Sequence, residues 1–400
     1  MKVGMKVGFI GLGKLGLPCA EVIATKHNVT GFDILDVDTR SFPVVQNIKE
    51  AVVDKEIVFV AVQTPHHPAY DGSNPTSTYQ PRDFNYTQVK QVLKEVNEYA
   101  TKEQLIVLIS TVLPGTTRKE LAPLVTNATL IYNPYLIAMG SVKWDMVNPE
   151  MIIIGKEHVD TDVGKLIVLY KLLMANDLTR YEIGTWEEAE SIKIFYNTFI
   201  SAKLSLVNMI QDVAMKLGNT NVDVITEALA NSTKRITGPQ YMTAGMGDGG
   251  PCHPRDNIAL RYMAQELNLG YDLFNSIMQS REVQAENLAK FLNNLAKEHN
   301  MEICIFGKSY KPGVPYTDGS YSLLVGHYCD QVKYIEDGDI TKPHIILLAH
   351  SPSHTYKYTG RPVDTNMQNI PAGSVVVDPW RSFAKTDKYK VVHYGNSRVE

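Results

Sequence analysis

One cysteine stands in a stretch of sequence that could do covalent chemistry. Residues 245–256 read Gly-Met-Gly-Asp-Gly-Gly-Pro-Cys-His-Pro-Arg-Asp, so four glycines and two prolines fall within twelve residues. This composition disfavours the interior of a helix or strand and predicts a shaped loop that passes close to another group. A histidine, an arginine and an acid follow Cys252, and such neighbours can activate a thiol as a nucleophile. A glycine-rich turn whose cysteine only packs would have the same composition, so the stretch alone leaves both interpretations open.

A second stretch, near the amino terminus, has the pattern of a dinucleotide site. The apolar run 6–10 predicts a strand, residues 11–16 form a GxGxxG turn, and a helix can follow over 17–26 before a second strand at 28–34. The glycines let the backbone approach a pyrophosphate at a helix N-terminus, and an acid about 20 residues on can bind a ribose diol and repel a 2′-phosphate. We therefore predict NAD rather than NADP, although a tight turn in an empty Rossmann fold stays an alternative. The predicted contacts are Gly11, Gly13, Leu15, Gly16 and Asp33.

Two continuous apolar runs, 57–62 and 105–109, are typical of parallel strands that are covered on both faces. Each run ends in polar residues, and the carboxyl ends of parallel strands line the ligand crevice of such sheets. We expect Thr64 and Thr111 to contact cofactor or substrate there, although both could be ordinary strand exits. Further elements are predicted as strands at 129–131, 151–154 and 181–183 and a helix at 161–175.

The connection at 65–84 contains four prolines and is long for a link between a strand and a helix. Long loops in compact domains often serve as lids or binding loops. His66 and His67 lie in it, but neither a carboxylate nor a cysteine stands at ligand spacing, so we predict no metal site.

A segment without glycine or proline, from Glu187 to about Lys216, predicts one long helix. Apolar residues occur on nearly all its sides, which predicts burial by more than one neighbour and hence a dimer core. Lys193 and Asn197 lie one turn apart on one face. Because burying them without partners is costly, we expect both to face the site; the alternative is that the lysines of this helix reach solvent.

The remaining chain predicts helices at 222–231 and 255–298, and then a second α/β region with strands at 301–306, 344–348 and 374–378 and a helix from about Ser322. The predicted fold class is α/β with three domains. They are an NAD-binding Rossmann domain at 1–184, a central helical domain with the long dimerising helix at 185–298, and a smaller C-terminal α/β domain at 299–400.

Composition excludes several classes of protein. The chain of 400 residues is 44% hydrophobic and 20% charged with a net charge of -4, as in ordinary soluble globular proteins. Without a long basic run we expect no nucleic acid and no membrane as partners, and no apolar run approaches the roughly 18 residues of a membrane span. The four scattered cysteines suit neither a disulfide framework nor a metal site, and no secretion signal precedes the first strand, so we expect a cytoplasmic protein.

Taken in order, these motifs resemble the UDP-glucose/GDP-mannose dehydrogenase family over nearly the whole chain. Besides the GxGxxG turn with Asp33 and the cysteine stretch, the matches are Ser110-Thr111-Val112, Glu190-Ser191-Ile192-Lys193 followed by Asn197, and Gly307 through Lys311-Pro312. The resemblance implies oxidation of the C6 alcohol of a nucleotide sugar, such as UDP-glucose, to a carboxylate with two NAD and a cysteine thioester. It also implies two α/β domains bridged by a dimerising helix, and thus a homodimer.

The resemblance also implies roles for single residues. Cys252 would be the nucleophile, Lys193 and Asn197 would stabilise the oxyanion, and Asp256 would handle protons and orient a water held by Thr111. The residues implied to bind substrate are Lys193, Asn197, Arg235, Gly249 and, on a nucleotide-binding C-terminal domain, Lys311.

This sequence departs from the family's pattern at three places. Where the family reads Glu-Phe-Leu-Ala-Glu, the chain has Tyr135-Leu136-Ile137-Ala138-Met139, and neither Tyr135 nor Met139 can be a carboxylate base at pH 7. Asp318 takes the place of an arginine, and the span from Cys329 to Leu348 is short for the strand and loops expected there. One missing glutamate is linked to thioester hydrolysis, so a two-electron dehydrogenase on the same fold is one alternative. A catalytically silent nucleotide-binding protein is another, although such a scaffold needs neither Cys252 nor Lys193.

Overall fold

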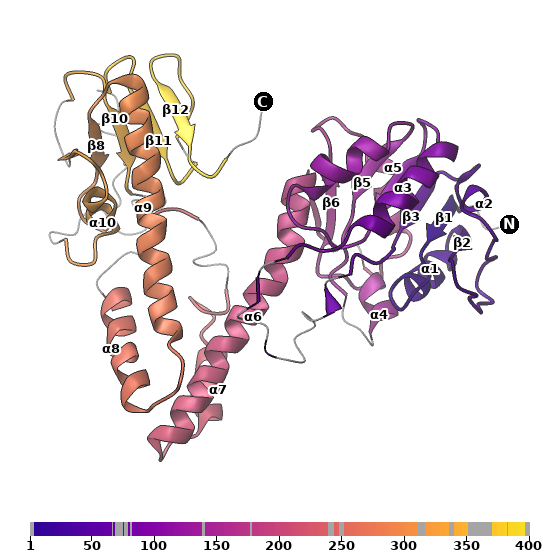
Figure 1. Cartoon of the computed structure of the whole chain (residues 1–400), viewed down its shortest axis with the longest axis horizontal. Helices are drawn as coiled ribbons and strands as arrows, with labels where there is room; N and C mark the ends of the chain where they lie inside the picture. Colours follow the sequence, from indigo (N-terminus) through magenta and orange to yellow (C-terminus); the bar gives the residue numbers. More distant parts are fainter. Residues whose placement is uncertain are drawn as a thin grey trace. The chain divides into compact units, whose positions relative to one another are not determined.

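The computed structural model describes residues 4–65, 67–68, 75, 79–80, 82–137, 141–176, 178–238, 244–247, 252–310, 317–335, 340–350, 370–381 and 383–396, without the side chains of Leu204, Cys252 and Arg255. The chain forms two compact units, Met1–Lys203 and Leu204–Glu400 (Figure 1). The boundary between the units falls within one long helix, α6 (Trp186–Leu217). This helix confirms the prediction of a single helix over 187–216.

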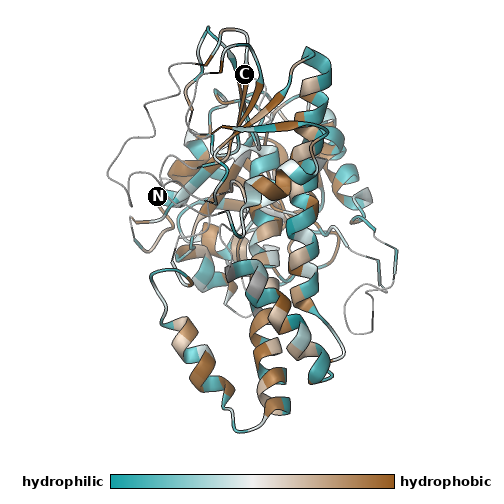
Figure 2. Ribbon diagram, turned by 90° about the vertical axis from the view of Figure 1, so that its left-hand side faces the viewer, coloured by the Kyte–Doolittle hydropathy of each residue, from teal (hydrophilic) through white to brown (hydrophobic). Residues whose placement is uncertain are grey.

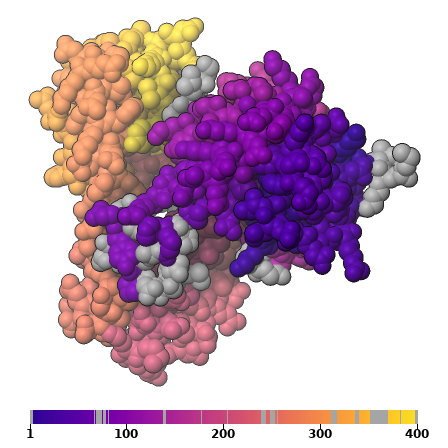
Figure 3. All heavy atoms as spheres, turned by 45° about the vertical axis from the view of Figure 1, so that its right-hand side comes forward, coloured from indigo at the N-terminus to yellow at the C-terminus, as the bar shows by residue number. Residues whose placement is uncertain are grey.

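The first unit is built on a sheet of seven strands in the order β2-β1-β3-β4-β5-β6-β7. All pairings are parallel except that of β5 with β6, which is antiparallel. Figure 3 shows most of the indigo and purple residues of this unit gathered into one body. The strands are β1 (Lys6–Ile10), β2 (Asn28–Phe32), β3 (Ile57–Val60), β4 (Leu105–Leu108), β5 (Thr129–Tyr132), β6 (Ile152–Lys156) and β7 (Tyr181–Thr185). Each of them was predicted within a few residues.

Helices cover both faces of this sheet, as the continuous apolar strands predict. Alternate residues of a strand point to opposite faces, so Phe59 packs with α1 (Gly16–Ala24), α4 (Val142–Val147) and α5 (Gly164–Lys171), whereas Val60 packs on the other side. The elements of that other side are α2 (Ile48–Val52), α3 (Thr87–Tyr99), the short turns η2 (Thr117–Leu121) and η3 (Ala122–Leu124), and the beginning of α6.

The second unit begins with helices and ends with a second sheet. After α6 come α7 (Val222–Ala230), α8 (Cys252–Glu266) and α9 (Leu273–His299). The predicted helical stretch 255–298 is therefore interrupted, by a turn in which Asn268 and Gly270 have positive φ angles of 47° and 83°. Helix α8 also begins earlier than predicted, within the stretch expected to be loop. Pro254 does not prevent this because the first-turn amides of a helix have no intrahelical acceptor.

The second sheet has five parallel strands in the order β12-β11-β10-β8-β9. They are β8 (Ile303–Phe306), β9 (Val332–Ile335), β10 (Ile345–Leu348), β11 (Val375–Asp378) and β12 (Lys390–His393), with α10 (Tyr321–His327) after β8. The carboxyl-terminal half of α9 and α10 pack on one face of this sheet. Although the span from Cys329 to Leu348 is short, it contains a complete strand, β9.

Figure 2 shows the strands of both sheets largely in brown, the colour of apolar residues, while the helices carry both brown and teal. This contrast is expected for strands buried on both faces and helices buried on one. None of the helices described here is both long and apolar enough to span a membrane.

Candidate active site

The glycine turn follows β1 directly and lies against the amino end of α1. Gly11 has a φ of +93°, and a Cβ there would lie 2.7 Å from the carbonyl oxygen of Ala61. A Cβ at Gly16 would overlap the carbonyl oxygen of Gly11. Gly13 differs, because a Cβ added there would meet no atom of the described chain within 4 Å. Gly11 and Gly16 are thus required by the packing of the turn, while Gly13 borders open space that a ligand can approach.

Helix α1 begins at this turn without a capping side chain. Its N-cap residue, Leu15, makes no side-chain capping hydrogen bond, and its first turn contains no acidic residue. The first amides of a helix have no intrahelical acceptor and, together with the helix dipole, favour an anion. The turn and the helix start therefore fit the pyrophosphate of a dinucleotide.

Asp33 follows β2 and faces the same turn. Its Oδ2 accepts a hydrogen bond from the amide of Leu12 at 2.6 Å, and its Oδ1 accepts one from the amide of Leu35 at 2.9 Å. These bonds fix the carboxylate at the carboxyl end of β2, and each oxygen keeps a lone pair for a further donor. A ribose diol would be such a donor.

The exits of β3 and β4 are joined by two side-chain hydrogen bonds. The Thr64 hydroxyl donates to the carbonyl oxygen of Thr111 at 2.6 Å, and the Ser110 hydroxyl donates to that of Val62 at 2.5 Å. The structure thus brings Thr64 and Thr111 together at the carboxyl edge of the sheet, as expected from their positions after parallel strands.

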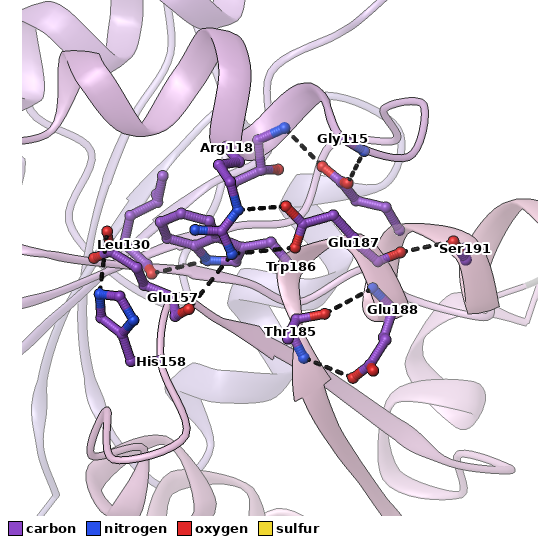
Figure 4. A network of polar contacts seen from close by, with 12 residues as sticks. Gly115, Arg118, Leu130, Glu157, His158, Thr185, Trp186, Glu187, Glu188 and Ser191 are labelled. Atoms are coloured by element: carbon purple, nitrogen blue, oxygen red, sulfur yellow. Dashed lines mark hydrogen bonds and ion pairs between the residues drawn. The ribbon is translucent and has the colours of Figure 1, made fainter. Parts of the chain in front are cut away.

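The beginning of α6 is fixed by a dense set of polar contacts (Figure 4). Thr185 and Glu188 form a capping box: the Glu188 amide donates to Thr185 Oγ1 at 3.3 Å, and the Thr185 amide donates to Glu188 Oε2 at 2.9 Å. Arg118 of η2 pairs with Glu187 and lies over the ring of the buried Trp186, 5.0 Å from its centre. The first turn of α6 is therefore stabilised by its own capping box, and Arg118 joins it to the connection that follows β4.

Lys193 lies two turns into α6 and is half-buried. Its Nζ donates to the carbonyl oxygen of Tyr135 at 2.6 Å, and burial lowers the pKa of this lysine below its usual value. Asn197, one turn later, is exposed within the single chain, and so is Lys203. The Lys193 side chain thus turns toward the segment after β5, whereas Lys203 is exposed to solvent, as the alternative for the lysines of this helix predicts.

The other predicted site residues belong to the second unit. Cys252 is the first residue of α8, and Asp256 lies four residues later on the same helix. Arg235 is exposed in the turn after α7. Gly249 and Lys311 lie outside the described residues, and so does Met139 of the first unit. Whether Cys252 and Asp256 meet Lys193 around one substrate stays a prediction.

Two models of one family match this chain. The NAD binding domain of the UDP-glucose/GDP-mannose dehydrogenase family matches residues 36–174, and the central domain of the same family matches residues 187–282. The two matches together span more than half of the sequence. The chain belongs to this family. Its cofactor is therefore NAD, in agreement with the fit of the glycine turn and Asp33.

Relatives in the UDP-glucose/GDP-mannose dehydrogenase family are divergent in sequence. UDP-glucose 6-dehydrogenase of Rickettsia typhi is 25% identical over 332 residues, which cover 77% of this chain and 74% of the relative. GDP-mannose 6-dehydrogenase of Pseudomonas aeruginosa is 25% identical over 349 residues, covering 77% and 75%. The structure of a ternary complex of GDP-mannose dehydrogenase from Pseudomonas aeruginosa has a TM-score of 0.75 at 19% identity, with 98% of this chain and 99% of that chain covered. This last likeness shows a shared fold.

At the position of a glutamate in the family's pattern, Tyr135 turns its side chain into the core. Its hydroxyl lies 2.9 Å from that of Tyr170, which in turn donates to Asn133, and Asn133 donates to the carbonyl oxygen of Ile153 at 2.6 Å. Burial raises the pKa of Tyr135 well above its usual value. The Tyr135 side chain therefore takes part in a series of hydrogen bonds in the core. Lys193 contacts residue 135 through its main-chain carbonyl.

The glycines before Cys252 pack against aromatic rings of the same unit. A Cβ at Gly245 would overlap the ring of Trp380, and one at Gly247, whose φ is +55°, would overlap the ring of Tyr321. Arg381 donates to the carbonyl oxygen of Ala244 at 2.6 Å. The predicted close approach is confirmed at these two glycines, and the groups approached are side chains at the exit of β11 and the start of α10. The segment that leads toward Cys252 is thus anchored on the C-terminal sheet.

The open space at Gly13 gives a test of the cofactor site in this dehydrogenase. We expect Gly13→Ala to fold normally and to bind NAD about tenfold or more weakly, because its methyl group would occupy space that the pyrophosphate needs. Gly16→Ala should instead lower both thermal stability and NAD affinity, since its Cβ overlaps a main-chain oxygen. Calorimetric titration with NAD and thermal unfolding measure the two effects. Unchanged NAD affinity in Gly13→Ala would show that no ligand approaches this turn closely.

Proposed function

We propose that the protein is an NAD-dependent nucleotide-sugar 6-dehydrogenase that oxidises the C6 alcohol of UDP-glucose, or of a related UDP-hexose, to the uronic acid through a thioester on Cys252. The observation that carries the proposal is Lys193, whose half-buried ammonium is held against the main chain at residue 135, on the helix that the family's central domain matches. A fixed cation of this kind suits a developing oxyanion. UDP-glucose comes first because several of the relatives carry the name UDP-glucose 6-dehydrogenase; GDP-mannose is the second substrate to test.

In this mechanism NAD, when bound, accepts a hydride from C6 in each of two oxidations. The Cys252 thiol adds to the C6 aldehyde, and Lys193 and Asn197 stabilise the oxygen of the resulting thiohemiacetal as it becomes negative. Oxidation of this adduct leaves a thioester. Asp256 then orients a water, held by Thr111, that attacks the thioester carbonyl and releases the thiol. The alcohol, one water and two NAD thus give a carboxylate, two NADH and three protons.

Arg235, Gly249 and Lys311 would bind the nucleotide sugar, and Asp318 would alter which sugar or phosphate fits beside them. An acid in place of a cation removes one favourable contact to a phosphate, so the substrate range is expected to differ from that of relatives with the arginine. The same substrate panel that tests the reaction therefore tests this difference.

We also propose a homodimer in the cytoplasm. Large apolar side chains of α6 stay exposed in the single chain, among them Phe195 at 56%, Phe199 at 60% and Met215 at 79%. Exposed apolar surface of this extent on one helix is typical of an interface, and a second copy of the chain would cover it. Light scattering of the purified protein would detect such a dimer as twice the mass of one chain.

The inward side chain of Tyr135 favours a second candidate, a two-electron dehydrogenase on the same fold that stops at the aldehyde. Without a carboxylate at this position, hydrolysis of a thioester would depend on Asp256. The identity of residue 135 therefore does not by itself decide between the two candidates. The product of the reaction, an aldehyde or a uronic acid, decides between them.

The experiment that tests the proposal measures NADH formed per nucleotide sugar consumed, at limiting sugar, over a panel of UDP- and GDP-hexoses. Two NADH per sugar, with a uronic acid identified by mass spectrometry, is the expected result. One NADH per sugar would favour the two-electron enzyme or a stalled thioester, which intact-protein mass would distinguish. No NADH with any sugar of the panel would contradict the proposed substrate class.

A further inference from the structure

Glu190 is a fully buried carboxylate on α6 with no role in the proposed chemistry. Its relative exposure is 0%, and its two oxygens accept hydrogen bonds from the amides of Gly115 and Thr117 at 2.5 and 2.7 Å. In Figure 4 the labelled Gly115, in the segment after β4, lies beside the beginning of α6. Burial raises the pKa of Glu190, while the bonds from Thr117 and Gly115 oppose the shift. Burying a carboxylate costs free energy unless its oxygens are hydrogen-bonded. The burial of Glu190 therefore indicates that its two hydrogen bonds have a structural role.

The segment that Glu190 holds begins at Thr111 and ends in η2. It is fixed at several points by side chains from other elements: Thr64 donates to the carbonyl oxygen of Thr111 at 2.6 Å, and the Leu113 amide donates to the Tyr86 hydroxyl at 3.2 Å. Gly115 has a φ of +90°, which an L-residue adopts only with strain. This conformation lets the chain turn so that two amides, those of Gly115 and Thr117, converge on one carboxylate.

Glu190 and Lys193 are three residues apart on α6 and therefore lie on the same side of the helix. Glu190 bonds to the segment of Thr111, and Lys193 bonds to the main chain after β5 at Tyr135. One turn of α6 thus carries both Glu190, whose carboxylate bonds the segment after β4, and Lys193, whose ammonium bonds the segment after β5.

We propose that Glu190 is a positioning residue that fixes Lys193 of α6 relative to Thr111 and the strand exits of the NAD-binding sheet. It acts through the main-chain amides of Gly115 and Thr117 and touches neither substrate nor cofactor. This inference rests on the proposed function for its effect on activity, whereas the contact itself can be tested independently.

The test is Glu190→Gln, with Glu98→Gln as control, because Glu98 is an exposed glutamate on α3 of the same unit. A glutamine has one acceptor oxygen, so its amide group would face one of the two N–H donors and could not bond it. We expect kcat to fall on the order of ten- to a hundredfold through misplacement of Lys193 and Thr111. NAD binding should weaken much less than kcat, since among the described residues no hydrogen bond joins Glu190 to the glycine turn at 11–16. In amide hydrogen exchange, Gly115 and Thr117 should exchange faster in Glu190→Gln, while Glu98→Gln should match the wild type in both measurements.

Two results would overturn this role. Wild-type kcat in Glu190→Gln would do so, and so would a loss of NAD binding in proportion to the loss of activity, which is what general unfolding produces. If the wild-type protein oxidises no nucleotide sugar, the proposed function fails, and only the amide exchange rates of Gly115 and Thr117 test the positioning role of Glu190. Exchange rates in Glu190→Gln that equal those of the wild type would then reject this role.

Discussion

Replacing Cys252 with alanine is expected to lower formation of the uronic acid by at least about a thousandfold. Without the thiol no thiohemiacetal can form at C6, so the second oxidation loses its covalent intermediate and no thioester is available for hydrolysis. NAD binding should stay as in the wild type, because the glycine turn and Asp33 belong to the first unit, whereas Cys252 begins α8 of the second. Product analysis by mass spectrometry at limiting sugar, together with an NAD titration, measures both consequences.

Cys329→Ala is the matched control for this variant. Burial raises the pKa of the Cys329 thiol to about 11, so at neutral pH it is protonated and a poor nucleophile. Its replacement should leave the yield of uronic acid unchanged. If Cys252→Ala still formed two NADH per sugar, the thioester route would be wrong. If wild type and Cys252→Ala both formed one NADH per sugar at similar rates, the two-electron enzyme would be the better description.

Much of the fold follows from short-range patterns. The strands β3 and β4 are continuous apolar runs, the turn at 11–16 has glycines at fixed spacing, and α6 lacks helix breakers over its length. Each of these signals lies within one element, so no tertiary information is needed to detect it. The continuous apolar runs of β3 and β4 also predict correctly that both faces of the first sheet are covered.

Other elements were not predicted, for different reasons. Helix α3 was implied only as the helix after the connection at 65–84, although Val89, Leu93 and Val96, buried at helical spacing, give it a signal of its own. The edge strands β9 and β12 are short and only half-buried, and such strands carry little alternation or apolar continuity. The antiparallel pairing of β5 with β6 depends on the path of the connection between them, which no local pattern specifies.

Contacts in the candidate site depend on residues far apart in the sequence. Glu190 is recognisable as part of a motif, but its bonds to Gly115 and Thr117 join residues 75 and 73 positions apart. The absence of a carboxylate at position 135 is evident from the sequence alone. That Tyr135 instead completes a buried chain with Tyr170 could not be predicted, since the direction of a side chain just after a strand depends on how that strand and α5 pack.

Lys193→Met is expected to lower kcat on the order of a hundred- to a thousandfold, the effect of removing one preorganised donor from an oxyanion. The KM for NAD should change little, because Lys193 bonds the main chain at Tyr135 and not the glycine turn. Lys203→Met is a matched control on the same helix, since Lys203 is exposed, and its kcat should equal that of the wild type. A wild-type kcat in Lys193→Met would remove this residue from the mechanism.

The pH dependence of kcat gives the second half of this test. Oxyanion stabilisation needs the ammonium form, and burial lowers the pKa of Lys193 from 10.5, so kcat should fall as the pH rises through that lowered value. The decline should therefore begin at a lower pH than for an exposed lysine. In Lys193→Arg the guanidinium cannot lose its proton in this range, so this alkaline decline should disappear, although the altered geometry lowers kcat. An alkaline decline that persists unchanged in Lys193→Arg would assign it to another group, and the ammonium of Lys193 would then not be the cation that stabilises the oxyanion.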